Sequence, residues 1–341
     1  MKNKRSLKLV ASVCMVVVLT LTLVLIGGCG ATGYRIGVFQ IVDHPALNLA
    51  RQGFEDALTA AVNATGETVT YYEENAAGEM SIALTIAESF VNQHVDLICA
   101  IATPCAQAAY IAVNETDIPV VFNSVTNPVV AGVVDNWTVP GGQVTGVSDL
   151  APVEPQLELI IDILEDVANN ITVEDLGVIY NPSEANSVYQ VDVQLVDAIA
   201  ALALNLTVHT AEAFDGLGVL TAAESLVGQV DAIWVPTDNT VVAAIGSVVG
   251  VCEDNDIPLF AADVSTVENG AIGCWGMDYY DVGYASGEMA AEILLNGANP
   301  ATMPVQTSPA NLLYVYPQEA TRQGVTIPQW VIDIADVVVT D

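Results

Sequence analysis

The side chains of this sequence that could do chemistry are hydroxyls, amides, carboxylates and aromatic rings, and they gather in seven short segments at the ends of apolar runs. Such groups hydrogen-bond a small polar molecule and stack against its rings, which is the chemistry of a binding cleft. The residues that we expect to line a cleft are Phe39, Gln40, Thr103, Pro104, Ser124, Thr126, Tyr180, Asn181, Asn186, Ser187, Thr237, Asp238, Asn239, Asp263 and Tyr279. Any one of them could instead cap a helix, and Phe39 could lie in a sheet core, but seven segments together favour a cleft.

No constellation in the sequence indicates catalysis. His44 lies in one of the seven segments, yet no G-x-S-x-G sequence is present to supply a serine nucleophile. Cys105 closely follows Thr103 and could be a reactive thiol at a helix N-terminus, with burial or a disulfide as the alternative. No Walker sequence is present. We therefore expect a protein that is not an enzyme, needs no cofactor and binds its ligand without converting it.

The cysteines do not indicate a metal site. Cys99, Cys105, Cys252 and Cys274 match no zinc-binding spacing, and no nearby histidine completes one. A disulfide between Cys252 and Cys274 and buried free thiols both remain open at this stage.

The seven segments need elements that bring them to one place. From Ile36–Gln40 onward, short apolar runs alternate with amphipathic stretches, which predicts strands and helices in turn, among them a helix over Met80–Asn92 and a strand over Ala232–Val235. After the strand Pro119–Phe122, the next element that the pattern predicts is a helix over Glu154–Ile163, and the alternation then continues to Leu312–Tyr316. This rhythm predicts an α/β fold of two doubly wound parallel-sheet lobes. Because ligands bind beyond the carboxyl ends of parallel strands, the seven segments would meet at one edge of each sheet.

The N-terminus resembles a lipoprotein signal peptide. Lys2, Lys4, Arg5 and Lys8 precede an apolar run that ends in Ile26-Gly-Gly-Cys29. This pattern predicts cleavage before Cys29 and lipidation of its thiol, which would anchor the chain to the outer face of the cytoplasmic membrane. The alternative is an uncleaved transmembrane anchor, which would also place the rest of the chain outside the cell.

The chain without this peptide is strongly acidic. Only Arg35, Arg51 and Arg322 remain as cations, against 41 aspartates and glutamates. Nucleic acid is therefore excluded as a partner, since binding phosphates requires Lys and Arg. Anionic lipid headgroups would repel such a surface, so the lipid itself must hold the protein at the membrane.

Nine short stretches resemble the substrate-binding lipoproteins of ABC transporters, in the tryptophan/tyrosine-binding group with the type I periplasmic-binding fold. These stretches are Ile41–Leu47, Ile101–Pro104, Pro119–Phe122 leading to Thr126–Pro128, Gly146–Asp149, Gln156–Leu159, Gly177–Asn181, Glu184–Ser187, Val235–Asn239 and Gly276–Tyr280. The resemblance covers essentially the whole chain after the signal peptide. It departs from the family at Cys105 and at Ala261-Ala-Asp263, where relatives tend to carry Gly-Ser-Asp.

The resemblance implies two lobes joined by three crossovers that close on a ligand like a hinged clamp. We place the crossovers near 148–152, 277–281 and 307–311. The expected division is a signal peptide over 1–28, a lipidated tether over 29–33, an N-terminal lobe over 34–149 plus about 281–308, and a C-terminal lobe over 150–280 plus about 309–341.

The resemblance also implies a small amino acid as ligand, an aromatic one above all. Its ammonium would pair with Asp263 or Asp238, and Phe39, Tyr180 and Tyr279 could stack on its ring. No arginine is well placed for its carboxylate, so backbone N–H groups at helix N-termini are expected to bind it, together with hydroxyls of residues 103, 124, 126 and 187. The expected partner is an ABC permease, to which a monomer delivers the ligand. The alternatives are a branched-chain amino acid, a nucleoside or a purine as ligand, and a sensor role at a membrane receptor.

Overall fold

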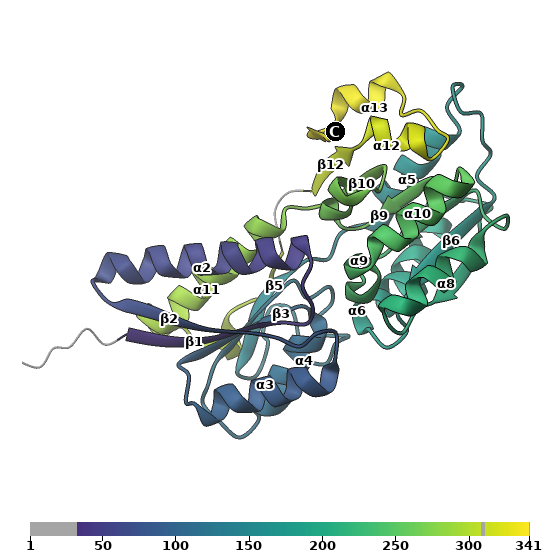
Figure 1. The fold of residues 1–341 in the computed structure, drawn as a ribbon. Coiled ribbons are helices and arrows are strands. Elements are labelled where there is room, and N and C mark those ends of the chain that lie inside the picture. The colour runs from purple at the N-terminus through teal and green to yellow at the C-terminus, as the bar shows by residue number, and fades with distance from the viewer. Residues whose placement is uncertain (1–32, 308–310, 341) are drawn as a thin grey trace, which may run out of the picture.

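The computed structural model describes residues 33–307 and 311–340 (Figure 1). The predicted signal peptide, Cys29 and all but the last residue of the predicted tether lie outside these ranges. No helix in the described part of the chain is both long and apolar enough to span a bilayer.

The first lobe is a parallel sheet with helices on both faces. Its strands are β1 (Gly33–Gln40), β2 (Thr68–Asn75), β3 (Leu97–Ile101), β4 (Val120–Asn123), β5 (Val144–Ser148) and β11 (Gln306–Thr307), in the order β11-β5-β4-β3-β1-β2. Its helices are α2 (Pro45–Thr65), α3 (Met80–Asn92), α4 (Thr103–Ala112) and α11 (Tyr279–Asn296), with the 3-10 turn η3 (Pro300–Thr302). The central strands β3 and β4 are buried along their whole length because helices cover both faces, whereas β2 at the edge is mostly exposed.

The second lobe repeats this architecture around a seven-stranded sheet. Its strands are β6 (Asp175–Tyr180), β7 (Thr207–Glu212), β8 (Ala232–Val235), β9 (Leu259–Ala261), β10 (Gly273–Met277), β12 (Asn311–Val315) and β13 (Val337–Val338), in the order β13-β12-β10-β9-β8-β6-β7. Its helices are α5 (Val153–Leu164), α6 (Ala185–Tyr189), α7 (Val196–Ala201), α8 (Gly216–Leu226), α9 (Asn239–Ala243), α10 (Ile245–Asn255), α12 (Pro317–Arg322) and α13 (Gln329–Ile334). The π-helix η1 (Gln190–Leu195) joins α6 to α7, and the 3-10 helix η2 (Val264–Asn269) follows β9. The predicted fold class, two doubly wound lobes, is confirmed.

The chain passes from one lobe to the other after β5, after β10 and after β11. The second passage brings α11 back to the first lobe, where it packs along α2 (Figure 1). Glycines allow the two helices to approach closely: a Cβ on Gly283 would lie 2.0 Å from the carbonyl oxygen of Ala50, and one on Gly53 would lie 2.1 Å from that of Tyr280. This contact ties a late segment of the sequence to the first helix of the chain.

Four strands depart from the sequence prediction, among them the two-residue strands β11 and β13, which were not predicted. β5 was not predicted, because its five residues follow a Gly-Gly turn and contain Gly146, whose missing Cβ lets the strand lie against Phe122. β12 was predicted, but it pairs antiparallel with β10, so the second sheet is not wholly parallel.

Of the two alternatives left open for Cys252 and Cys274, the structure has buried free thiols and not a disulfide. All four described cysteines are free and buried. Cys252 and Cys274 belong to the apolar core of the second lobe, and burial raises the pKa of the Cys252 thiol to about 12. Burial also raises the pKa of Cys105 well above its usual value, so this thiol is inert and not reactive.

Candidate ligand-binding site

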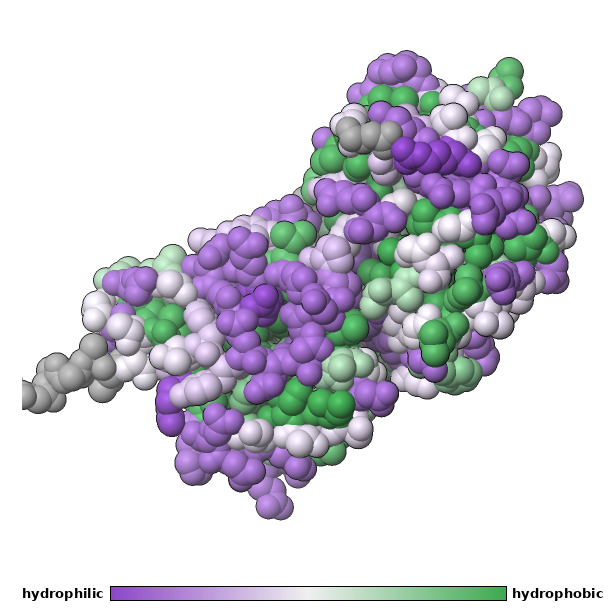
Figure 2. Space-filling model, viewed as in Figure 1, coloured by the Kyte–Doolittle hydropathy of each residue, from purple (hydrophilic) through white to green (hydrophobic). Residues whose placement is uncertain are grey.

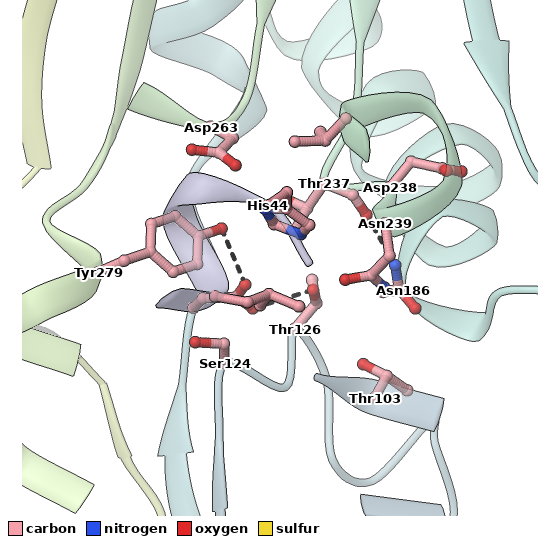
Figure 3. A pocket seen from close by; sticks show the side chains of 13 residues that line it. His44, Thr103, Ser124, Thr126, Asn186, Thr237, Asp238, Asn239, Asp263 and Tyr279 are labelled. Carbon is pink, nitrogen blue, oxygen red and sulfur yellow. Dashed lines mark hydrogen bonds between the residues drawn. The ribbon is translucent and has the colours of Figure 1, made fainter. Parts of the chain in front are cut away.

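A nearly filled cavity of about 10 Å³ lies between the two lobes, which meet along the seam in Figure 2. This is about the space that one water molecule needs, so an amino acid enters only when the lobes or the lining side chains move apart. The residues that line it are His44, Leu47, Thr103, Ser124, Thr126, Asp149, Asn186, Thr237, Asp238, Asn239, Val242, Asp263 and Tyr279 (Figure 3).

The fold itself brings these side chains together. In the first lobe, the segments that follow β1, β3, β4 and β5 supply the residues from His44 to Asp149, and the start of α11 supplies Tyr279. In the second lobe, α6 supplies Asn186, and the segments after β8 and β9 supply the rest. Since strands of a parallel sheet end at the same edge, each lobe presents one row of short polar side chains to the other.

Asp149 is the centre of a buried hydrogen-bonded group at one end of the cavity. Thr126 donates its hydroxyl to Oδ1 of Asp149 (3.0 Å), and Tyr279 donates to Oδ2 (3.1 Å). Asp149 is 3% exposed. Burial raises the pKa of its carboxyl to about 6, although both hydrogen bonds act in the opposite direction. A cation placed here would favour the ionised carboxylate and lower this pKa.

Asp263 supplies a second buried carboxylate from the opposite lobe. It caps η2, because the backbone N–H of Ser265 donates to its Oδ1 (2.8 Å). Burial raises the pKa of Asp263 to about 6, and the charge of Asp149 adds to this shift. In Figure 3 Asp263 and Tyr279 lie on the same side of the cavity.

No lysine or arginine lines the cavity as the structure describes it. Arg35 is paired with Asp96, and Arg51 with Glu55 and Glu73, both on the surface of the first lobe. The carboxylates of the cavity therefore have no cation from the protein, and the site favours a ligand that carries one.

Glu184 organises the wall that the second lobe contributes. Its carboxylate accepts the backbone N–H groups of Asn239 (3.2 Å) and Thr240 (3.1 Å) at the start of α9, and the side-chain amide of Asn186 (3.0 Å). Asp238 caps the same helix by accepting the N–H of Val241 (2.9 Å). Burial and the neighbouring Glu184 raise the pKa of Asp238. Its two oxygens are thus already occupied by backbone groups, which makes Asp263 the better ammonium partner of the two aspartates first considered.

Nine of the fifteen residues expected in a cleft line this cavity. They are Thr103, Ser124, Thr126, Asn186, Thr237, Asp238, Asn239, Asp263 and Tyr279.

The other six lie elsewhere, each with a local partner. Phe39 is fully buried in the first core and packs edge to face against Phe90, with ring centroids 5.8 Å apart. Gln40 donates to Asn48 at a separate surface groove. The remaining four, Pro104, Tyr180, Asn181 and Ser187, do not line the cavity; Tyr180 packs on the core of the second lobe, and Ser187 donates to the carbonyl of Asn181 (3.0 Å).

Four cavity residues were absent from the expected set: His44, Leu47, Asp149 and Val242. His44 was weighed only as a catalytic group. Asp149 ends one of the nine stretches that carry the resemblance, but its role was hidden because β5 was not predicted and because its partner Tyr279 is 130 residues away. The positions of Leu47 and Val242 in their helices carried no signal that distinguished them from core residues.

Residues 35–339 match the family model described as ABC transporter substrate binding protein. The chain is 39% identical over 273 residues to a tyrosine-binding protein of Clostridioides difficile, which covers 80% of this chain and 76% of that protein. It is similar to a domain from Streptococcus pneumonia solved in complex with L-Trp, with 33% identity, a TM-score of 0.82 and coverage of 90% of this chain and 100% of the other. It is also similar to the ligand-free, open structure of a substrate binding protein with adhesive properties from Clostridium difficile, with 36% identity, a TM-score of 0.63 and the same coverage.

The arrangement of the lobes is closer to the tryptophan complex than to the open structure. Sequence identity does not explain this, because the open structure is the slightly more identical of the two. Together with the enclosed cavity, the higher TM-score indicates a closed arrangement, in which residues of both lobes face one space.

Proposed function

The chain belongs to the family of ABC transporter substrate binding proteins, a family of binding proteins and not of enzymes, and from this premise we propose that its substrate is an aromatic α-amino acid. The mechanism is binding with lobe closure: a ligand that contacts both rows of side chains stabilises the closed form over the open one.

The observation that carries the proposal is the pair of buried carboxylates, Asp149 and Asp263, at one end of a cavity without a lysine or arginine in its described lining. An ammonium group placed between them would be held by one carboxylate from each lobe. Tyr279 keeps Asp149 oriented for this contact by donating to its Oδ2. Closure would then depend on the charge that the ligand brings.

The carboxylate of an α-amino acid shares a carbon with its ammonium, so it must bind at the same end. Ser124 and Thr126 lie there, at the end of β4, where the backbone turns at Ser124 with a φ of 58°. We assign the carboxylate to the backbone N–H groups of this turn, in place of an arginine, because the hydroxyls of Ser124 and Thr126 already donate to Asn123 and Asp149. The side chain of the ligand then extends toward Thr103 and Asn186, which lie across the cavity in Figure 3.

The aromatic character of the ligand is supported by the comparisons. One relative is named for tyrosine and another was solved with L-Trp. Leu47, Val242 and the imidazole of His44 provide flat or apolar surface in the cavity for a ring.

We further propose that Cys29 carries the lipid that anchors the protein outside the cytoplasmic membrane, and that a monomer delivers the ligand to an ABC permease. The lobes would move as the two predicted domains, 34–149 with about 281–308 and 150–280 with about 309–341. A Cys29→Ala variant tests the anchor: it should appear in the soluble fraction and lose labelling by a fatty-acid probe, whereas unchanged membrane association would indicate a transmembrane anchor.

The experiment that tests the ligand is calorimetric titration of the chain from residue 30, in high salt and after removal of any copurified ligand, with tryptophan, tyrosine, phenylalanine and leucine. Saturable one-to-one binding of an aromatic acid, with leucine much weaker, supports the proposal. Preferential binding of leucine would indicate a branched-chain amino acid instead. Absence of binding to all four, by folded protein, would contradict the proposal and direct attention to nucleosides, purines and a sensor role.

A further inference from the structure

Both ring nitrogens of His44 and three oxygens at the cavity have no hydrogen-bond partner among the described residues; the three oxygens are Oγ1 of Thr103, Oδ1 of Asn186 and Oγ1 of Thr237. Thr103 is 2% exposed and Asn186 is 3% exposed, so bulk solvent does not reach these two side chains. Asn186 and Thr103 lie across the cavity from Tyr279 (Figure 3), and Asn186 is hydrogen-bonded to the carbonyl of Thr237. Since buried polar atoms are nearly always paired in native proteins, these three are expected to bind a group of the ligand.

The amide of Asn186 can face the cavity in only one way. Its Nδ2 donates to Oε2 of Glu184 (3.0 Å) and to the carbonyl oxygen of Thr237 (2.7 Å). Both partners are acceptors, so a flipped amide would place its own oxygen, in place of the NH₂ group, against these two oxygens. Oδ1 of Asn186 is therefore held in the cavity as an acceptor, and it requires an N–H or O–H donor from the ligand.

The hydroxyls of Thr103 and Thr237 place a further requirement on the ligand. A hydroxyl can donate as well as accept, so Thr103 and Thr237 can each donate to an oxygen of the ligand. A phenol has one O–H donor and two lone pairs: it can donate to Asn186 and accept from both threonines. A phenyl ring satisfies none of the three atoms, and an indole N–H satisfies only the acceptor.

Resting on the proposed function, we propose that this polar end of the cavity selects an aromatic amino acid whose ring carries a hydroxyl, so that tyrosine is the substrate and phenylalanine is rejected. Thr103 belongs to the first lobe, whereas Asn186 and Thr237 belong to the second. The ring hydroxyl would therefore link the lobes at one end of the ligand, as its ammonium links them through Asp149 and Asp263 at the other. A ligand without the hydroxyl would close the lobes over three unpaired polar atoms, and the cost of those atoms is what discriminates against it.

The first test is calorimetric titration of the chain from residue 30 with tyrosine, phenylalanine and 4-fluorophenylalanine, which replaces the hydroxyl with a group of similar size that cannot donate. We expect tyrosine to bind about 100-fold more tightly than either analogue, or better. Saturable binding of tyrosine and phenylalanine with equal affinity would overturn this inference and leave the proposed function intact. Absence of binding to all three would overturn this inference, and the proposed function would then stand only if tryptophan binds.

The second test removes the hydroxyls one at a time with little change of shape, in Thr103→Val and Thr237→Val. Each variant should bind tyrosine about tenfold more weakly and phenylalanine no more weakly than the unmodified protein does, so the ratio of the two affinities narrows.

Thr126→Val is the matched control for these variants, because its hydroxyl bonds Asp149 at the other end of the cavity. It should weaken both ligands alike and keep the ratio. An unchanged ratio in both Thr103→Val and Thr237→Val would overturn the assignment of this end. If either variant fails to fold, as judged by circular dichroism, the titrations of the unmodified protein with tyrosine, phenylalanine and 4-fluorophenylalanine decide whether this end of the cavity selects the hydroxyl.

Discussion

Affinity for an amino acid should fall as the pH is lowered from 7.5 to 5, because the ligand needs ionised carboxylates. In the closed arrangement without a ligand, burial raises the pKa of Asp149 and that of Asp263 to about 6, against 3.8 for an ordinary aspartate. An ammonium between them lowers both values in the complex. A group that releases its proton on binding supports full affinity above its free-state pKa and progressively less below it. The affinity should therefore be constant above about pH 7 and decline below pH 6.

The size of the decline follows from the same pKa values. Each carboxylate that must lose a proton weakens binding by about tenfold for each pH unit below 6, so two carboxylates give about a hundredfold loss at pH 5. At pH 5.5 each is about three-quarters protonated in the free protein, and binding should release about one and a half protons per ligand.

Calorimetric titration in two buffers of different ionisation enthalpy measures this number directly, because the difference in heat is proportional to the protons released. Asp149→Asn and Asp263→Asn should each remove about half of the release. Equal affinities at pH 7.5 and pH 5, with no buffer-dependent heat, would refute the reasoning and show that the ligand does not meet these carboxylates as a cation.

His44 contributes in the same direction and needs its own control. Its imidazole is 6% exposed in the closed arrangement, and burial lowers its pKa to about 4. Closure with a neutral imidazole is unopposed above pH 6.5 and is opposed increasingly as the pH falls from 6.5 to 4. A His44→Gln variant should keep the proton release that comes from the two aspartates. Complete loss of proton release in this variant would show that His44, and not the aspartates, causes the pH dependence.

Three further predictions follow from the cavity and the helix contact. Asp263→Asn should weaken amino-acid binding more than tenfold in calorimetry at pH 7.5, and an unchanged affinity would remove this residue from the site. The double variant Thr237→Ala, Asn239→Ala should also bind more weakly, since full affinity would mean that the second lobe does not contact the ligand. Gly283→Ala should lower the free energy of unfolding by about 1–3 kcal/mol or more in urea titration, because its Cβ would lie 2.0 Å from a carbonyl oxygen of α2. Gly250→Ala is its control: nothing lies within 4 Å of the added Cβ, and this change in α10 should stabilise the protein by up to about 1 kcal/mol, so equal effects of the two would contradict the close packing.

Much of the fold could be predicted because each lobe is built from local patterns. The buried strand β8 and the helix α3 were predicted with their observed bounds, since their apolar periodicity is contained in a few consecutive residues. β5 could not be predicted in the same way: it is five residues long, and its burial comes from β4 and β11 on either side and not from its own composition. The direction of β12 was likewise invisible, because it depends on how the last passage between the lobes returns the chain to β10.

The candidate site, too, could be predicted only in part. Residue order and composition are enough to show that polar segments follow the strands and that no arginine is available among them. Which of those side chains face the cavity depends on how the chain folds. Asn186 and Ser187 are neighbours, yet one lines the cavity and the other turns back to the carbonyl of Asn181, since successive residues of a helix point in directions about 100° apart. Asp149 and Tyr279 meet only because a late passage of the chain returns α11 to the first lobe, and no local pattern in the sequence records that contact.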